Sequence, residues 1–216
     1  MVLKLYGFPL STCTRRVALV LKEKNVPYEL VPVDLTKNEH KSAEFMTKQP
    51  FGQVPYIVEE DGFQLYESRA IGRYIALKYA GQGNKILPDP SDFKNTALFE
   101  QAASIELTNF DPFASGLAFE KVFKPRKGLG ETNEEVVASL TKQLNAKLDA
   151  YEVLLSTSKY LAGDEVTLAD LFHIPYGAML GVMGIDVLES GTRPNVARWW
   201  KDITSRPSWQ AVKNGA

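Results

Sequence analysis

The sequence predicts an α/β domain that is followed by an all-helical domain. Residues 3–33 show strand, helix and strand patterns in turn, and residues 56–79 add two short strands and a helix. Beyond residue 93, apolar residues recur at helical spacing. The order βαβ followed by ββα is that of a thioredoxin-like domain. The fold class is therefore a thioredoxin-like amino-terminal domain followed by an all-helical carboxy-terminal domain.

The first three elements form a βαβ unit. Residues 3–6 alternate like a strand, and residues 12–24 follow a helical pattern that stops at the breakers of residues 25–27. Residues 28–33 are rich in β-forming residues. Two strands joined through a helix are typical of a parallel pair. The polar stretch at 36–48 is expected to be irregular or weakly helical.

A hairpin and a helix complete the first domain. Residues 56–58 and 63–66 flank Asp61-Gly62, a dipeptide suited to the positive φ angles of a tight turn. Ser68 is then expected to cap a helix over 68–79 whose apolar residues face inward.

A linker is predicted at residues 80–90, which contain prolines and glycines and show no periodicity. We therefore expect two domains, one at 1–82 and one at 90–216. The second domain opens with a helix at 93–109. Asp111-Pro112 is expected to end or kink this helix, because proline cannot donate the backbone hydrogen bond of a helix interior.

Two capping boxes predict helix starts in the second domain. Thr132 with Glu135 precedes an apolar stripe that extends to Leu155. The second box runs from Thr167 to Asp170.

The second box carries its own hydrophobic staple, because Val166 and Leu171 flank it on either side. It predicts the start of a buried helix. His173 lies on that helix between apolar neighbours, and we expect it to be a core histidine with satisfied hydrogen bonds.

The composition argues against several functions. The 25 basic and 26 acidic residues are interspersed, which leaves no basic face for nucleic acid. No apolar run approaches the roughly 20 residues that span a bilayer, so we expect no membrane partner. Cys13 is the single cysteine, so we expect no internal disulfide. The chain has only two histidines, His40 and His173, and these three residues do not have the spacing of metal ligands, so we expect no metal site. These features predict a cytoplasmic protein.

Ser11 is the first candidate for chemistry. It lies between a strand end and a helix start, where free backbone amides and the positive helix end favour an anion. A hydroxyl that donates to a thiol sulfur at this place would favour the thiolate. Taken alone, however, such a serine is more simply explained as a helix cap.

The Val54-Pro55 step is the second candidate. It leads directly into an apolar strand, which is typical of a cis-proline loop that offers backbone groups to an extended peptide. Gln53 adds a side-chain amide. An ordinary turn before a strand explains the same residues about equally well. A peptide that contains a cysteine would fit such a loop.

Glu67 and Ser68 are the third candidate. They offer a carboxylate for an ammonium group and, one residue later, a hydroxyl and a helix N-terminus for a carboxylate. A γ-glutamyl end carries both groups on one carbon. A simple helix cap explains these residues too. His40 and Lys41 could pair with a further carboxylate, although a solvated surface pair is the simpler interpretation.

Cys13 supports a competing mechanism. Near a helix N-terminus its thiol could act in thiol exchange, but the chain has no resolving cysteine. A small apolar core residue is the more common role of a lone cysteine.

Together these motifs resemble those of cytosolic glutathione transferases, and among them the phi class of plants and fungi. The resemblance runs over essentially the whole chain. Besides Ser11, the segments that resemble the family are Thr14-Arg15-Arg16, Glu39-His40-Lys41, residues 50–55, residues 67–71, residues 160–163 and residues 167–170.

By position, the resemblance implies that Ser11 stabilises the glutathione thiolate, with Thr12 as the second candidate. Val54 would pair its backbone with the cysteinyl unit beside cis Pro55. The other glutathione contacts are implied for His40, Lys41, Gln53, Glu67 and Ser68. Candidates for the electrophile pocket are Phe8, Leu10, Leu35, Phe113, Phe119 and Phe123.

The resemblance implies transfer of glutathione, as co-substrate and without a further cofactor, to hydrophobic electrophiles by a homodimer. Reduction of organic hydroperoxides by the same thiolate is a second activity compatible with it. Two alternatives stay open. One is a non-catalytic carrier of hydrophobic ligands, and the other is a thiol transferase that depends on Cys13.

Overall fold

The computed structural model describes residues 2–216, which form two compact units. Unit 1 comprises the residues up to Leu87 together with Arg206–Ala216, and unit 2 comprises Pro88–Ser205. The segment 206–216, which we expected in the second domain, thus belongs to unit 1. The reason is that α10 (Pro207–Val212) packs against α1 (Thr12–Glu23).

Unit 1 is built on a four-stranded sheet. Its strands are β1 (Leu3–Gly7), β2 (Tyr28–Pro32), β3 (Tyr56–Val58) and β4 (Gln64–Tyr66), in the spatial order β2-β1-β3-β4. The β1–β2 pair is parallel, and β3 pairs antiparallel with both β1 and β4. The predicted thioredoxin-like βαβ-ββα order is therefore confirmed.

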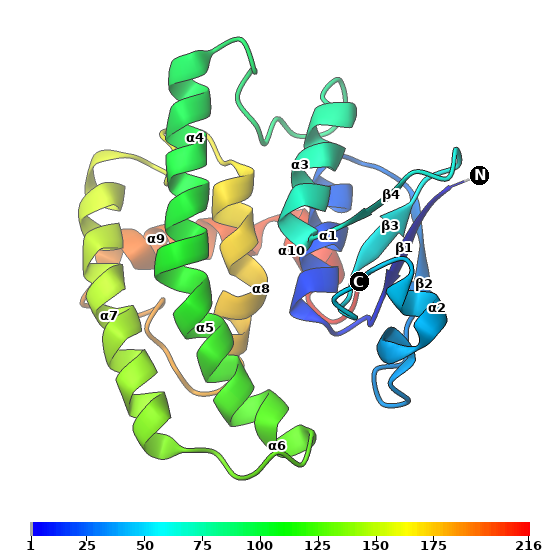
Figure 1. The fold of residues 1–216 in the computed structure, drawn as a ribbon. Helices are drawn as coiled ribbons and strands as arrows, with labels where there is room; N and C mark the ends of the chain where they lie inside the picture. Colours follow the sequence, from blue (N-terminus) through cyan, green and yellow to red (C-terminus); the bar gives the residue numbers. More distant parts are fainter. Residues whose placement is uncertain (1) are drawn as a thin grey trace. The chain divides into compact units, whose positions relative to one another are not determined.

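Helices cover both faces of this sheet (Figure 1). One face, with the fully buried Leu5 and Ile57, lies toward α1 and α3 (Ser68–Lys78). On the other face Tyr56 packs with Phe45, which comes from the short α2 (Ala43–Met46). The weak helical tendency expected over 36–48 thus takes the form of α2 and of a 3₁₀ turn at Glu39–Lys41.

Buried Glu23 fastens the end of α1 to the carboxy-terminal segment. Its carboxylate accepts hydrogen bonds from Arg206 Nε at 2.7 Å and Nη2 at 2.8 Å, from Asn84 Nδ2 at 2.7 Å, and from the Ser208 hydroxyl. Arg15 adds a second link, because its Nη1 donates to the Lys213 carbonyl at 2.8 Å. These bonds explain why residues far apart in sequence form one unit.

Unit 2 is helical, as predicted. Its helices are α4 (Phe93–Ile105), α5 (Asp111–Ala118), α6 (Lys124–Arg126), α7 (Glu134–Thr157), α8 (Leu168–Val182) and α9 (Pro194–Ser205). Among residues 2–216, no helix combines the length and the apolar character needed to cross a membrane.

Helices α4, α5 and α6 follow one another without a loop (Figure 1). Wider π-helical turns join them at Glu106–Phe110 and Phe119–Phe123, and each ends shortly before a proline, Pro112 or Pro125. Asp111 and Lys124 each donate to a carbonyl five residues back. Proline disrupts the regular i to i−4 ladder, and a π turn is one way to accommodate the disruption. The expected break at Asp111-Pro112 is thus a local widening of a continuing helix.

The first predicted capping box is wrong. Asn133, not Thr132, is the N-cap of α7, and its side chain accepts from the N–H groups of Glu135 and Val136. Thr132 instead donates its hydroxyl to the Glu120 carbonyl at 3.1 Å. The two residues are adjacent and both are good caps, so a tertiary contact decides between them.

The second capping box is confirmed. Thr167 and Asp170 exchange side-chain and backbone hydrogen bonds at the start of α8. The Asp170 carboxylate, which is fully buried, also accepts from Leu161 N at 3.0 Å and from Trp199 Nε1 at 2.9 Å. His173 is likewise the predicted core histidine, since its ring contacts the Tyr151 hydroxyl at 3.0 Å and the Ala169 carbonyl at 2.7 Å.

Candidate functional site

The candidate site lies at one edge of the unit 1 sheet. Strand register pairs Tyr6 with Tyr56 and Tyr56 with Tyr66, so the end of β1, the start of β3 and the end of β4 lie in one row. Ser11 follows β1, Val54-Pro55 precedes β3, and Glu67-Ser68 follows β4. The three predicted pieces therefore meet at the same edge, although 57 positions separate the first from the last.

Ser11 is the N-cap of α1. Its Oγ accepts a hydrogen bond from Thr14 N at 3.4 Å, and its backbone is extended, with φ −62° and ψ 132°. A hydroxyl that accepts at a cap keeps its own hydrogen to donate elsewhere. Within residues 2–216 that hydrogen has no acceptor. The capping role and a role toward a bound thiolate are thus compatible.

The two neighbours of Ser11 are placed differently. Thr12 is only 4% exposed, so its side chain lies in the interior of unit 1. Cys13 is half-buried, and its sulfur accepts from Arg16 Nη1 at 3.4 Å. Of the three adjacent side chains, Ser11 is the one whose hydroxyl is both accessible and able to donate.

The Val54–Pro55 peptide bond is cis, as the sequence analysis predicted. Val54 packs against the cluster of Val33, Phe45 and Tyr56, and Pro55 is buried beside it. Gln53 is exposed just before this step. The side-chain amide of Gln53 is therefore accessible to a ligand at the sheet edge.

His40 and Lys41 lie against the loop that leads into this step. Lys41 Nζ donates to the Phe51 carbonyl at 3.1 Å. A Cβ added to Gly52, which has φ +57°, would lie 2.8 Å from the His40 carbonyl oxygen and from Lys41 Nζ. Glycine is thus required there for two reasons, its backbone angle and the close approach of residues 40–41.

Glu67 has φ 72° and ψ 105°, which is rare for a residue with a side chain. Such a backbone costs of the order of 1–3 kcal/mol and is often found at ligand sites. Glu67, not Ser68, is the N-cap of α3, and Ser68 is the first helical residue, which corrects the predicted cap. The Glu67 side chain makes no capping bond, so its exposed carboxylate remains available.

Arg16 is a residue to which the sequence analysis assigned no role, although it lies in the Thr14-Arg15-Arg16 segment. It is fully buried in α1, and its Nη1 donates to Ser68 Oγ at 2.9 Å as well as to Cys13 Sγ. It therefore joins the Ser11 side of the site to the start of α3. Its position one helical turn after Thr12, and one turn before the buried Leu19, could have indicated a buried arginine.

Tyr56 cannot serve as a base at neutral pH. Burial, the neighbouring Tyr6 hydroxyl and Glu44 raise the pKa of Tyr56 to about 12. Its ring stacks on that of Tyr6, with centroids 4.5 Å apart. The stacked rings of Tyr6 and Tyr56 thus form an aromatic support at the edge of the sheet that carries the candidate site.

The predicted electrophile-pocket residues are divided between the two units. In unit 1 Leu35 packs on the Val33 cluster and Leu10 is 56% exposed. Phe8 is half-buried there. In unit 2 Phe119 is 41% exposed, while Phe113 and Phe123 are half-buried. None of the six lines the cavity found within unit 2.

No group of three or more His, Cys, Asp and Glu side chains is arranged to hold an ion in the described part of the chain.

Comparisons with known proteins identify the family of the chain. Residues 1–77 match the family model described as the glutathione S-transferase N-terminal domain, and residues 110–207 match that of the C-terminal domain. A glutathione S-transferase of Arabidopsis thaliana is 52% identical over 198 residues, which is 91% of this chain and 89% of that protein. The chain belongs to the glutathione S-transferase family.

Solved structures extend the family assignment. A glutathione transferase from Populus trichocarpa superposes with a TM-score of 0.92 at 41% identity, over 98% of each chain. Maize glutathione S-transferase I in complex with an atrazine glutathione conjugate gives a TM-score of 0.88 at 34% identity, over 98% of this chain and 96% of that one. Several relatives carry F-series names, which denote the phi class, and the resemblance to that class is confirmed.

Proposed function

We propose that Ser11 stabilises the thiolate of bound glutathione, and that this thiolate attacks hydrophobic electrophiles, the transfer reaction of the family. The observation that carries the proposal is the Ser11 hydroxyl. It caps a helix of 12 residues, keeps a hydrogen to donate, and lies at the sheet edge shared by Val54-Pro55 and Glu67-Ser68. A donated hydrogen bond and the positive end of α1 both favour a negatively charged sulfur.

Glutathione would lie extended along this edge. The Val54 backbone would pair with its cysteinyl unit, because a proline follows and leaves those groups outside the sheet ladder. The Glu67 carboxylate would take the γ-glutamyl ammonium, while Ser68 and the N-terminus of α3 take the neighbouring carboxylate. His40, Lys41 and Gln53 would hold the polar groups at the glycyl end.

The reaction balances without a further reagent. The thiol proton goes to solvent, the sulfur forms a bond to the electrophilic carbon, and a leaving group such as chloride departs with the bonding electrons. Rate enhancement would come from the ionised thiol and from proximity to the acceptor. Phe8, Leu10 and Leu35, with Phe113, Phe119 and Phe123, remain our candidates for holding that acceptor.

We also propose that the protein is a homodimer and that it works in a reducing, cytoplasmic compartment. Free glutathione must be present as the thiol for this chemistry, which requires a reducing compartment. Sedimentation should give about twice the chain mass of 24.1 kDa, and a purely monomeric protein would contradict the dimer.

Ser11→Ala should lower kcat/KM for conjugation of glutathione to 1-chloro-2,4-dinitrobenzene by roughly 10- to 100-fold near neutral pH. This range follows from the roughly 1.5–3 kcal/mol of a hydrogen bond to a charged group. The midpoint of the pH profile should move up, toward the pKa of ~8.5 of a free thiol.

Ser11→Gly is the matched control for helix capping. Glycine caps a helix nearly as well as serine but carries no hydroxyl, so its conjugation activity should fall as far as that of Ser11→Ala. Thr12→Val and Cys13→Ser should keep activity within a few fold. Full activity in Ser11→Ala, or a large loss in Cys13→Ser alone, would overturn the proposed role of Ser11.

Gly52→Ala should raise the KM for glutathione about tenfold, since small displacements of binding groups are costly. The added Cβ would push residues 40–41 away from the site. Gly62→Ala is the control, because Gly62 also has a positive φ, +86°, but has nothing within 4 Å of an added Cβ. The KM for glutathione, from steady-state kinetics, and the thermal stability are measured for both variants and compared. An equal KM in the two variants would show that His40 and Lys41 do not bind glutathione.

A further inference from the structure

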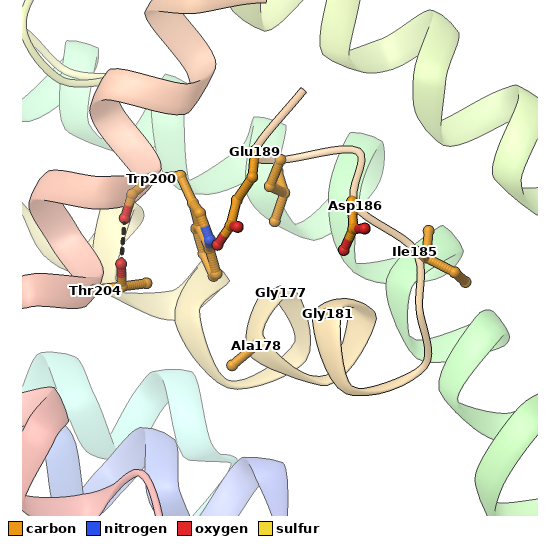
Figure 2. A pocket seen from close by; sticks show the side chains of 9 residues that line it. Gly177, Ala178, Gly181, Ile185, Asp186, Glu189, Trp200 and Thr204 are labelled. Atoms are coloured by element: carbon orange, nitrogen blue, oxygen red, sulfur yellow. Dashed lines mark hydrogen bonds between the residues drawn. The ribbon is translucent and has the colours of Figure 1, made fainter. Parts of the chain in front are cut away.

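Unit 2 contains a cavity that is separate from the candidate site of unit 1. It lies between the end of α8, the loop of residues 183–190 and α9, and its volume is about 240 Å³ (Figure 2). The lining residues that determine its shape and charge are Gly177, Gly181, Ile185, Asp186, Glu189 and Trp200.

Two glycines of α8 make the cavity possible. A Cβ on Gly177 would lie 2.4 Å from Cη2 of Trp200, so only glycine allows the indole to pack this closely. Gly181, one turn further along, would meet nothing within 4 Å. The space above Gly181 is therefore open, and the indole of Trp200 forms a wall beside it (Figure 2).

The Trp200 wall is rigid. Trp200 is only 5% exposed, and its ring packs against that of Trp199 with centroids 6.2 Å apart. Ile185 and Leu188 add apolar surface. An apolar group in the cavity would therefore meet a fixed aromatic side chain, of which only a small part is accessible, together with Ile185 and Leu188.

The charges of the cavity have a single sign. Asp186 and Glu189 both line it, and Figure 2 shows both carboxylates on the loop side, opposite α8. None of the nine residues that line the cavity is basic. Through their charge, the two carboxylates attract a cation and repel an anion.

We propose that this cavity binds a small aromatic ammonium ion. Its ring would pack against Trp200 above Gly181, and its ammonium group would lie between Asp186 and Glu189. The volume is below the roughly 300–1,000 Å³ of sites for drug-sized ligands, so one or two rings fit. Glutathione and its conjugates carry a net negative charge and would be repelled. The site is thus independent of the one proposed for transfer.

Three naphthalenes of similar size and different charge test the proposal by isothermal titration calorimetry. They are 1-naphthylmethylammonium, neutral 1-naphthalenemethanol and anionic 1-naphthoate, each titrated in excess S-hexylglutathione to occupy the glutathione site. The cation should bind with a Kd on the order of 0.1 mM. The alcohol should bind roughly tenfold more weakly, and the anion should show no binding.

Gly181→Leu locates the site. Leucine would fill the open space, and because it is a better helix former than glycine the variant should be at least as stable to heat. Binding of the cation should disappear. Retained binding in a folded Gly181→Leu variant would overturn the proposal, whatever the conjugation activity.

Charge neutralisation separates electrostatic recognition from simple apolar binding. Asp186→Asn with Glu189→Gln should weaken binding of the cation about tenfold, to the level of the alcohol. Asp164→Asn with Glu165→Gln is the control, because it removes the same charge from exposed residues before α8 that do not line the cavity. Equal affinity for all three naphthalenes, or an equal loss in both double variants, would contradict the proposal.

Discussion

Asp170→Ala should lower the free energy of unfolding by roughly 4 kcal/mol, which is among the largest effects of a single substitution. The carboxylate is fully buried and accepts from Leu161 N, from Thr167 N at 2.9 Å, from Thr167 Oγ1 at 3.1 Å and from Trp199 Nε1. Alanine would leave these donors buried without an acceptor. Each unsatisfied donor costs about 1–3 kcal/mol, although the costs do not add fully.

The measurement is denaturant unfolding followed by the fluorescence of the three tryptophans, which include Trp199. Asp164→Ala is the control, since this exposed aspartate lies in the loop just before α8 and its loss should change the unfolding free energy by less than about 0.5 kcal/mol. Asp170→Asn keeps one acceptor oxygen and should lie between the two. If Asp170→Ala and Asp164→Ala behaved alike, the capping box would not stabilise unit 2.

Glu23→Gln is expected to cost about 3 kcal/mol of unfolding free energy, because it leaves the Arg206 cation beside a neutral amide. Glu29→Gln is the matched control in the same unit. Its carboxylate is 59% exposed and 4.0 Å from Lys4, a geometry that contributes little. Arg206→Met combined with Glu23→Gln should recover part of the loss, since replacing both partners avoids an unpaired buried charge.

The effect of Glu23→Gln should depend on pH. Burial by itself raises the pKa of Glu23, but hydrogen bonds from Arg206, Ser208 and Asn84 outweigh burial, so the pKa lies below its ordinary value. A depressed folded pKa stabilises the protein above the unfolded pKa of ~4.3, and this contribution is lost as the pH falls through the folded value. The stability gap between wild type and Glu23→Gln should therefore be full at pH 7 and shrink below about pH 4. A gap independent of pH would show that Glu23 is not ionised in the folded protein.

Local sequence signals predicted the parts of the structure that depend on near neighbours. The cis bond before Pro55, the box at Thr167 and the hairpin at Asp61-Gly62 each rest on a few consecutive residues, and the structure contains all three. The register of the strands brings the pieces around Ser11 and Glu67 to one edge, and the structure shows this register.

Contacts between distant residues could not be predicted in this way. Nothing near Arg16 in the sequence indicates Ser68, and nothing near Glu23 indicates Arg206, which is 183 positions away. The choice of Asn133 over Thr132 depends on a bond to Glu120, which lies on an earlier helix. The backbone angle of Glu67 is equally hidden, because it is imposed by surrounding structure against the preference of the residue itself.

Unit 1 is formed by two separate stretches of the chain, and these are synthesised at different times. Its first part leaves the ribosome early, but the segment with Arg206 and Ser208 is made only after all of unit 2. Until then Glu23 lacks its cation, and the face of α1 that α10 covers stays open. The nascent chain therefore cannot complete unit 1, the half that we propose binds glutathione, before unit 2 is made. That half closes last, and a chain stopped at residue 205 would expose a buried acid and an apolar helix face to the quality-control machinery of the cell.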